Sequence, residues 1–164
     1  MQKCEQFLLT ELPNKGLFDN GLSYKCQSLT FLIIKNGDFD CTIYNSHYFI
    51  AVESCLMIPQ MSTITGIRMS TDFQGYLLSL SKGFIDQIKV IINCNGIWMS
   101  NQTLRVHRME PEEFSSIERH IELLKCNTHD SEGSIKEAAR LVQMALACTI
   151  TRLFMNDHDE ITCH

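Results

Sequence analysis

Short apolar segments separated by turn residues fill the first half of the chain. Residues 29–35 (LTFLIIK) are rich in branched and aromatic side chains. Asn36-Gly37 follows as a turn, because both residue types accept a positive φ. Residues 39–44 (FDCTIY) alternate between apolar and polar side chains and resume as a second strand. The pattern therefore predicts a β-hairpin made of these two segments.

The strand pattern continues to residue 80. Residues 48–52 and 55–58 are predicted to pair with each other around Glu53-Ser54, and Pro59 ends the second strand because proline donates no hydrogen bond to a ladder. Two further strands are predicted at residues 62–70 and 73–80. Many short strands at this spacing are typical of an antiparallel sandwich or barrel.

The apolar spacing becomes helical after Ser81, which is a suitable N-cap. Five apolar side chains recur at that spacing: Phe84, Ile85, Ile88, Ile91 and Ile92. They predict a short helix near residues 81–92. Residues 96–107 are ambiguous, and we expect a loop there with a short strand at 103–107.

A longer helix is predicted from Pro111, which suits the first helical position. Glu112 and Glu113 favour its first turn through the helix dipole. One apolar stripe follows, formed by Phe114, Ile117, Ile121 and Leu124. The helix is expected to end near Asn127.

A second long helix begins with a capping box, Ser134 and Glu137, and runs to about Met155. At about 100° per residue, one face carries Ile135, Ala138, Ala139, Val142, Leu146, Thr149, Ile150 and Leu153. A second stripe lies nearly opposite and carries Leu141, Met144, Cys148 and Met155. One interpretation makes this second stripe a dimer interface. The alternative is that both stripes are intramolecular, one against the first helix and the other against the sheet.

Composition limits the possible functions. The chain has 164 residues, of which 45% are hydrophobic and 20% charged, and this fits one packed domain with a helical appendage. The net charge is −5 and the 14 Lys and Arg residues are scattered, so we do not expect this chain to bind DNA directly. The start of the chain lacks the apolar core of a signal peptide, and no apolar run approaches the roughly 20 residues of a membrane span. We therefore expect a cytoplasmic protein.

The eight cysteines have no CxxC spacing and are predicted to be reduced and mostly buried. His47 stands alone, and Cys126-x-x-His129 is separated by a long helix from the histidines and the cysteine at the chain end. A metal site needs three or four converging ligands, so we expect no metal and no other cofactor. The nucleophile-elbow, dinucleotide-binding and phosphate-loop motifs do not occur in the sequence.

Residues 29–59 (LTFLIIKNGDFDCTIYNSHYFIAVESCLMIP) resemble the first half of an AraC-type sensor domain, with a strand ending in a polar residue plus Gly, a hairpin, and a strand ending in Pro. Residues 72–88 (DFQGYLLSLSKGFIDQI) resemble the strand-to-helix segment that follows. Two terminal helices complete a match over roughly residues 22–155. The resemblance implies a mainly β fold, a cupin-like antiparallel β-barrel or sandwich followed by two helices, that binds a small effector and pairs subunits.

The resemblance also implies a division of the chain. Residues 1–107 would form the cupin-like sensor, residues 108–155 the two-helix dimerisation segment, and residues 156–164 the start of a linker to a DNA-binding domain absent from this chain. The expected function is the ligand-sensing and dimerisation half of an AraC-like transcriptional regulator, which is a homodimer and not an enzyme. The alternatives are a stand-alone cupin-fold enzyme and a purely structural dimerisation module. Metal-binding cupins carry an HxH pair and a Glu after a glycine like Gly37, and the lone His47 departs from that pattern.

The barrel strands supply the candidate effector pocket. If Asn36 points inward, strand alternation directs Leu32 and Ile34 inward too. Arg68 or Arg105 could clamp an anionic effector, although a solvated surface arginine is the default interpretation of each. The predicted pocket comprises Leu32, Ile34, Asn36, Arg68, Phe73, Leu77 and Ser79. The alternative is that these side chains simply fill a small barrel.

Overall fold

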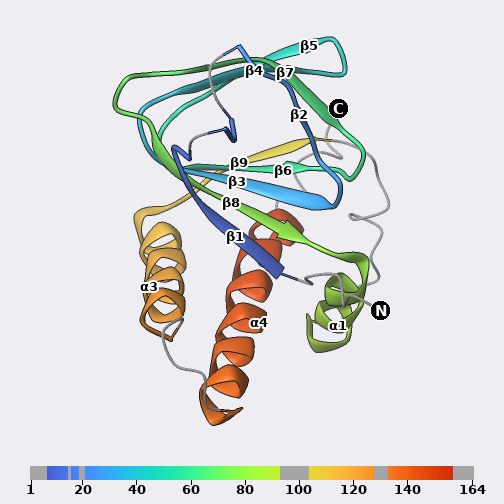
Figure 1. Cartoon of the computed structure of the whole chain (residues 1–164), viewed down its shortest axis with the longest axis vertical. Coiled ribbons are helices and arrows are strands. Elements are labelled where there is room, and N and C mark those ends of the chain that lie inside the picture. The colour runs from blue at the N-terminus through green and yellow to red at the C-terminus, as the bar shows by residue number, and fades with distance from the viewer. Residues whose placement is uncertain (1–6, 15, 19–20, 93–103, 128–132, 157–164) are drawn as a thin grey trace.

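The computed structural model describes residues 7–14, 16–18, 21–92, 104–127 and 133–156. Its elements form three layers, which are an outer sheet, a helix-facing sheet and a layer of helices (Figure 1). The helix-facing sheet has the strand order β1 (Phe7–Leu12), β8 (Gln74–Leu80), β3 (Leu29–Asn36), β6 (Ser54–Ile58) and β9 (Arg105–Arg108). The outer sheet has the order β2 (Tyr24–Lys25), β7 (Thr63–Met69), β4 (Phe39–Ile43) and β5 (Ser46–Ile50). All strand pairs between these elements are antiparallel.

The strands β3 to β9 lie near the segments that the apolar pattern predicts, whereas β1 and β2 are not predicted and two predicted pairings are wrong. β3 and β4 do not form a hairpin, because β3 pairs with β6 and β8 whereas β4 pairs with β5 and β7. The turn at Gly37, with φ +79°, carries the chain from one sheet to the other. The observed hairpin joins β4 to β5 through Tyr44 and Asn45, both at positive φ, as two-residue hairpin turns require.

The second wrong pairing is that of residues 48–52 with 55–58. The chain changes sheet between β5 and β6 at Glu53, whose φ is +63°. The Glu53 N–H donates to the carbonyl of Ile34 (3.0 Å), which fixes the crossover against β3. β6 lies inside the helix-facing sheet, between β3 and β9, and not in an isolated hairpin. All five of its residues are therefore buried.

Each face of the helix-facing sheet supports a separate apolar core. Phe31 and Ile33 of β3 point to the helices, and Leu32 and Ile34 point to the outer sheet. We call the second of these clusters the inter-sheet core. The alternation along β3 thus joins the two cores through one strand.

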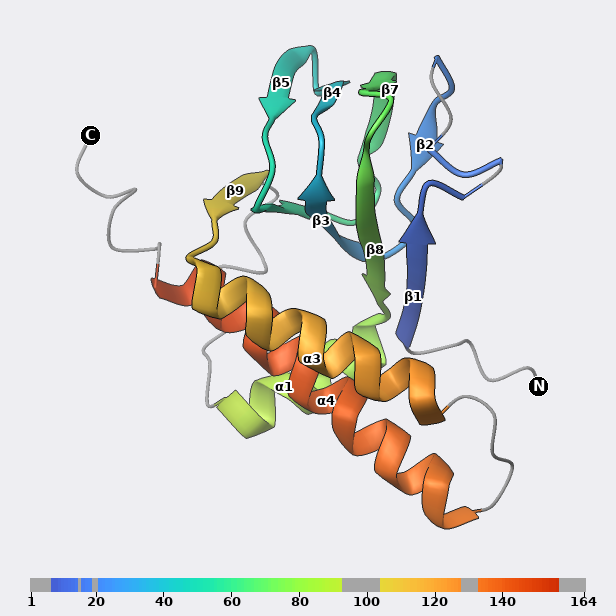
Figure 2. The same ribbon diagram turned by 90° about the vertical axis from the view of Figure 1, so that its left-hand side faces the viewer.

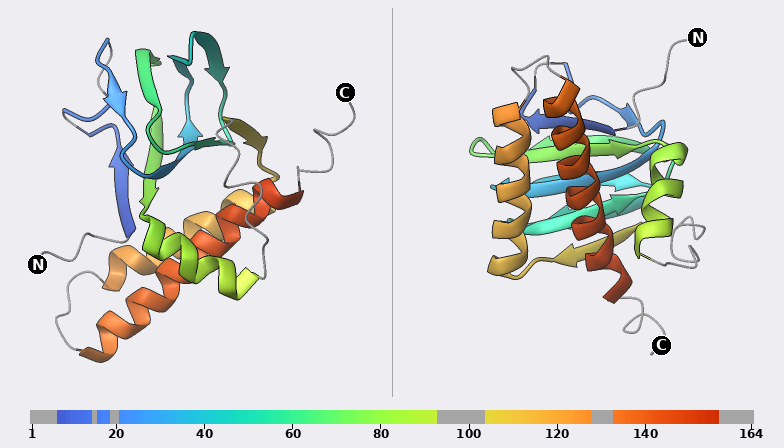
Figure 3. Two further views of the ribbon diagram at one scale, coloured as in Figure 1. Left: turned by 90° about the vertical axis from the view of Figure 1, so that its right-hand side faces the viewer. Right: turned by 90° about the horizontal axis from the view of Figure 1, so that it is seen from below.

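The helices cover one face only. α1 (Lys82–Ile92), α3 (Pro111–Asn127) and α4 (Gly133–Asn156) lie under the helix-facing sheet, with α4 between the other two (Figure 2, Figure 3). Residues 136–155 of α4 are long and apolar enough, by length and composition, to cross a membrane. Here that helix packs on the sheet, and Leu146, Ile150 and Phe154 are fully buried against it.

Packing between β8 and β3 depends on Gly75. A Cβ added there would lie 2.5 Å from the carbonyl oxygen of Ile33. We expect Gly75→Ala to lower the free energy of unfolding by about 1–3 kcal/mol, because the two strand backbones would have to separate. Gly83→Ala is the matched control, since nothing lies within 4 Å of its added Cβ in α1, and it should raise stability by up to about 1 kcal/mol. Urea unfolding measures both, and equal effects would contradict this packing.

Candidate functional site

Four residues of the predicted pocket lie together in the inter-sheet core. All four belong to one cluster of buried side chains and are at most 4% exposed: Leu32, Ile34, Phe73 and Leu77. Ser79 is half-buried on the same face of β8 as Leu77. The described side chains of this cluster are buried and pack against one another, as the alternative interpretation of the sequence expects of a filled barrel.

The two other predicted pocket residues do not point between the sheets. Asn36 is exposed, and its Nδ2 donates to the carbonyl oxygen of Asp72 (3.2 Å). A register shift between Ile34 and Asn36 breaks the alternation that the prediction relied on. Arg68 is exposed on the outer face of the outer sheet, opposite Asp40. Neither residue is a polar group of a barrel interior.

Sequence reasoning missed a polar corner at one side of the inter-sheet core. Tyr24 of β2 and Cys26 lie there with the buried Thr30, whose hydroxyl donates to the carbonyl of Ser28 (2.9 Å). Burial raises the pKa of Tyr24, and burial raises that of the Cys26 thiol to about 11, so both groups are neutral at pH 7. A two-residue strand such as β2 leaves no periodicity to recognise, which explains the omission.

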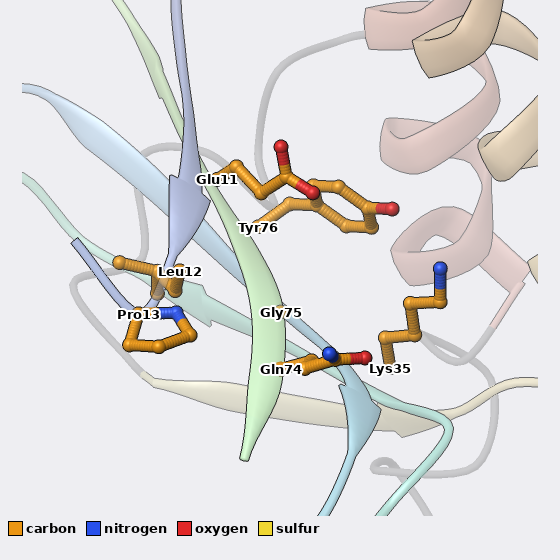
Figure 4. A pocket seen from close by; sticks show the side chains of 7 residues that line it. All are labelled: Glu11, Leu12, Pro13, Lys35, Gln74, Gly75 and Tyr76. Atoms are coloured by element: carbon orange, nitrogen blue, oxygen red, sulfur yellow. The ribbon is translucent and has the colours of Figure 1, made fainter. Parts of the chain in front are cut away.

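A pocket of about 270 Å³ opens where β1, β3 and β8 end. We call it the strand-end pocket. It is lined by Glu11, Leu12, Pro13, Lys35, Gln74, Gly75 and Tyr76. Figure 4 shows Tyr76 and Lys35 pointing to the helical side of β8, while Leu12 and Pro13 lie on its other side. The pocket combines a carboxylate, an ammonium, an amide and a phenol with a small apolar wall, and this set suits a small molecule bearing several hydroxyl groups.

Ion pairs connect the strand-end pocket to α3. The Lys35 ammonium lies 3.1 Å from Oε1 of Glu118, and the Lys125 ammonium lies 3.3 Å from Oε1 of Glu11. Lys125 also sits 5.9 Å from the centre of the Tyr76 ring. The hydrogen bond to Glu118 raises the pKa of Lys35, and burial raises the pKa of Tyr76. Both lysines are partly exposed, so each pair contributes less than about 1 kcal/mol to stability.

The predicted dimer stripe on α4 is mostly covered by the chain itself. Cys148 is 8% exposed, and Met144 and Met155 are half-buried against the core under the sheet. Only Leu141, at 67% exposed, projects into solvent. Because α4 lies between α1 and α3, both of its apolar stripes find partners within the chain. This packing favours the alternative in which both stripes are intramolecular, and the dimer interface on the second stripe stays a prediction.

A shallow groove follows the outer face of α3. It is lined by Ser115, Glu118, Arg119, Glu122, Leu123 and Cys126. Leu123 is 51% exposed, which is unusual for a leucine on a helix whose other face is already buried. We call this surface the α3 groove.

Metal-ligating residues do not gather in the described part of the chain, where no three His, Cys, Asp or Glu side chains converge. His47 pairs with Asp40 on the outer sheet, and His107 lies 3.3 Å from Glu113. His129, the second member of the Cys126-x-x-His129 pattern, lies outside the described residues, as do residues 157–164 of the expected linker. Nothing among the described residues assembles a nucleophile with a general base.

No protein-family model matches the sequence, and no curated protein matches it. Solved structures do match. Apo ToxT K231A from Vibrio cholerae covers 93% of this chain with a TM-score of 0.57 and 11% identity, and fatty acid-bound wild-type ToxT from the same organism covers 95% with a TM-score of 0.54 and 10% identity. The AraC-like transcriptional activator CuxR covers 76% with a TM-score of 0.48 and 11% identity. The chain spans 58% and 57% of the two ToxT chains and 43% of the CuxR chain.

The matches confirm the predicted fold and the resemblance that led to it. The two ToxT structures have TM-scores above 0.5, and this chain shares the fold of the part of ToxT that it matches, mostly antiparallel β-sheets with helices. At 10–11% identity the likeness is one of fold.

The five described cysteines are free, and four of them are buried, as the sequence predicts. Burial raises the pKa of Cys26 to about 11 and that of Cys41 to about 12, whereas Cys126 is exposed. At pH 8 only about one Cys26 thiol in a thousand is then a thiolate, the reactive form. Iodoacetamide should therefore label Cys126 well before Cys26 or Cys41 in the folded protein, and all three alike in urea. Peptide mass spectrometry measures this, and early labelling of Cys26 would contradict the described burial.

Proposed function

We propose that this chain is the ligand-sensing and dimerisation domain of an AraC-like transcriptional regulator, located in the cytoplasm, with DNA bound by a separate domain. The observation that carries the proposal is the shared fold, in which one barrel and its helices follow ToxT over 93% of this chain. The net charge of −5 supports a division of labour, because a DNA-contacting surface needs clustered basic residues. The sensor, the dimerisation segment and a linker would occupy residues 1–107, 108–155 and 156–164.

The effector is proposed to bind in the strand-end pocket rather than in the inter-sheet core. The core side chains are packed against each other, whereas the pocket is open and offers Glu11, Lys35 and Gln74 as polar groups. An unsaturated fatty acid is bound to ToxT in one solved structure. The polar lining here favours a hydroxyl-rich effector instead, because neutral hydroxyl groups satisfy carboxylate, amide and ammonium partners without leaving a charge unpaired.

An effector in this pocket would change the position of α3. It would compete for Lys35, which holds Glu118, and for Glu11, which holds Lys125. Each pair is weak enough for a small ligand to replace. The expected mechanism is a shift in population between two positions of α3, driven by the difference in effector affinity for them.

The α3 groove is proposed as the dimer interface. Its residues lie symmetrically about the middle of the helix, so an antiparallel pair of α3 helices sets Arg119 against Glu122 of a second copy, twice by symmetry. The same register sets Leu123 against the aliphatic part of Glu118.

Ligand binding is tested by thermal unfolding of the full chain across a panel of sugars and other polyols. A compound that fills the strand-end pocket at about 100 times its Kd should stabilise the fold by about 2.7 kcal/mol, and raise Tm by roughly 5–10 °C. Lys35→Met and Gln74→Ala should abolish the shift. Lys25→Met, which removes an exposed lysine of the outer sheet, should leave it intact. A shift that survives Lys35→Met and Gln74→Ala would place the effector elsewhere.

The dimer interface is tested by charge exchange on α3. Arg119→Glu or Glu122→Arg alone should convert the dimer to monomer, because each places like charges in contact twice. The double variant should restore the dimer. Leu141→Asp on α4 is the control and should leave the mass unchanged. Sedimentation equilibrium measures each mass, and a monomer produced by Leu141→Asp but not by Arg119→Glu would assign the interface to α4.

A further inference from the structure

Arg105 is a buried charge on the helix side of the sheet. It opens β9 and is 8% exposed. In the strand register it stands opposite Met57, whose side chain belongs to the core under the sheet. His107, two residues further on, lies on the same side, and the centre of its ring is 6.1 Å from that of Phe154 in α4. The guanidinium therefore lies between β9 and the helical layer, which passes below the strand in Figure 3.

Within the described residues, this guanidinium has no counter-charge. Its Nη1 is buried and donates to no acceptor, and no described carboxylate forms an ion pair with it. Lys35 and Lys125, which are far more exposed, do have carboxylate partners. Residues 93–103, which lead into β9, contain no Asp or Glu. A buried charge that lacks a partner is strongly unfavourable, so a site of this kind is expected to acquire an anion.

We propose that Arg105 binds the carboxylate of a small amphiphilic monoacid between β9 and the helices. The planar guanidinium fork matches a carboxylate through two parallel hydrogen bonds. A single positive charge is balanced by a single negative one, whereas a phosphate monoester would leave excess negative charge in a buried place. Met57, the register partner of Arg105, belongs to the apolar core that the hydrocarbon part of the acid would contact.

The carboxylate site is separate from the strand-end pocket and stands whether or not that pocket binds an effector. It has its own connection to α3. β9 ends at Arg108, three residues before α3 begins, and His107 contacts Glu113 in the first turn of that helix. An acid held by Arg105 would thus act on the strand that positions the start of α3.

The unliganded protein supplies the first test. If the guanidinium has no partner in the chain, Arg105→Met should leave Tm unchanged or raise it, because the substitution removes an uncompensated charge and keeps the volume. Seven acidic side chains lie outside the described residues, and three of them, Asp157, Asp159 and Glu160, stand together in the sequence after α4; the other four are Glu5, Asp19, Asp130 and Glu132. A triple variant, Asp157→Asn with Asp159→Asn and Glu160→Gln, should therefore leave Tm unchanged. A marked fall in Tm for Arg105→Met, or for the triple variant, would mean that the partner belongs to the chain and would overturn the proposal.

The ligand supplies the second test. Straight-chain monocarboxylates from butanoate to decanoate, below their micellar concentrations, are compared at pH 7 with the primary amides of the same length. The acids should raise Tm increasingly with chain length, and the amides should not. Arg105→Met should weaken acid binding by at least about tenfold, while Arg68→Met, which removes an exposed arginine, should leave it unchanged. Equal shifts for acids and amides, shifts that persist in Arg105→Met, or no shift with any acid would each overturn the proposal.

Discussion

The burial of the helix-facing sheet on both of its faces is the constraint on which the rest of the structure depends. The first six residues of β3 are buried, with Phe31 and Ile33 facing the helices and Leu32 and Ile34 facing the outer sheet. Burying each of these side chains stabilises the folded state by about 1.5–3 kcal/mol. Removing either neighbouring layer would expose half of the strand to water. The barrel and the helices therefore stabilise each other through a shared strand, and neither is a complete core alone.

In this arrangement, side-chain contacts connect the strands of the helix-facing sheet to α3. α3 lies at the side of the helical layer, tied to strand ends by exposed ion pairs such as Lys35 with Glu118, and to β9 through His107 and Glu113. These contacts are weak individually, whereas the packing of α4 under the sheet is extensive. Under the proposed function, a ligand would act on these ion pairs of α3, and the α3 groove would place the subunit contact on the same helix.

Periodicity predicted most of the elements correctly, because alternation and helical spacing are local properties of the sequence. It did not predict which strands pair, since the crossovers at Gly37 and Glu53 depend on contacts between residues far apart in the chain. β1 and β2 escaped notice because one is an edge strand of mixed polarity and the other has two residues. The strand-end pocket joins the ends of three strands that only tertiary structure brings together. For the same reason, the sequence could not show that Arg68 is exposed while Arg105 is buried.

The central claim is that the barrel and the helices form one cooperative unit. Amide hydrogen exchange of the full chain, compared between the natural sequence and Ile34→Ala, tests this directly. Ile34 belongs to the inter-sheet core and not to the core under the sheet. Its truncation to Ala should lower the free energy of unfolding by about 2–4 kcal/mol. If the unit is cooperative, the slowest amides of α3 and α4 should exchange about 30- to 1,000-fold faster, in step with those of β8. Faster exchange in the strands with unchanged rates in the helices would contradict the account.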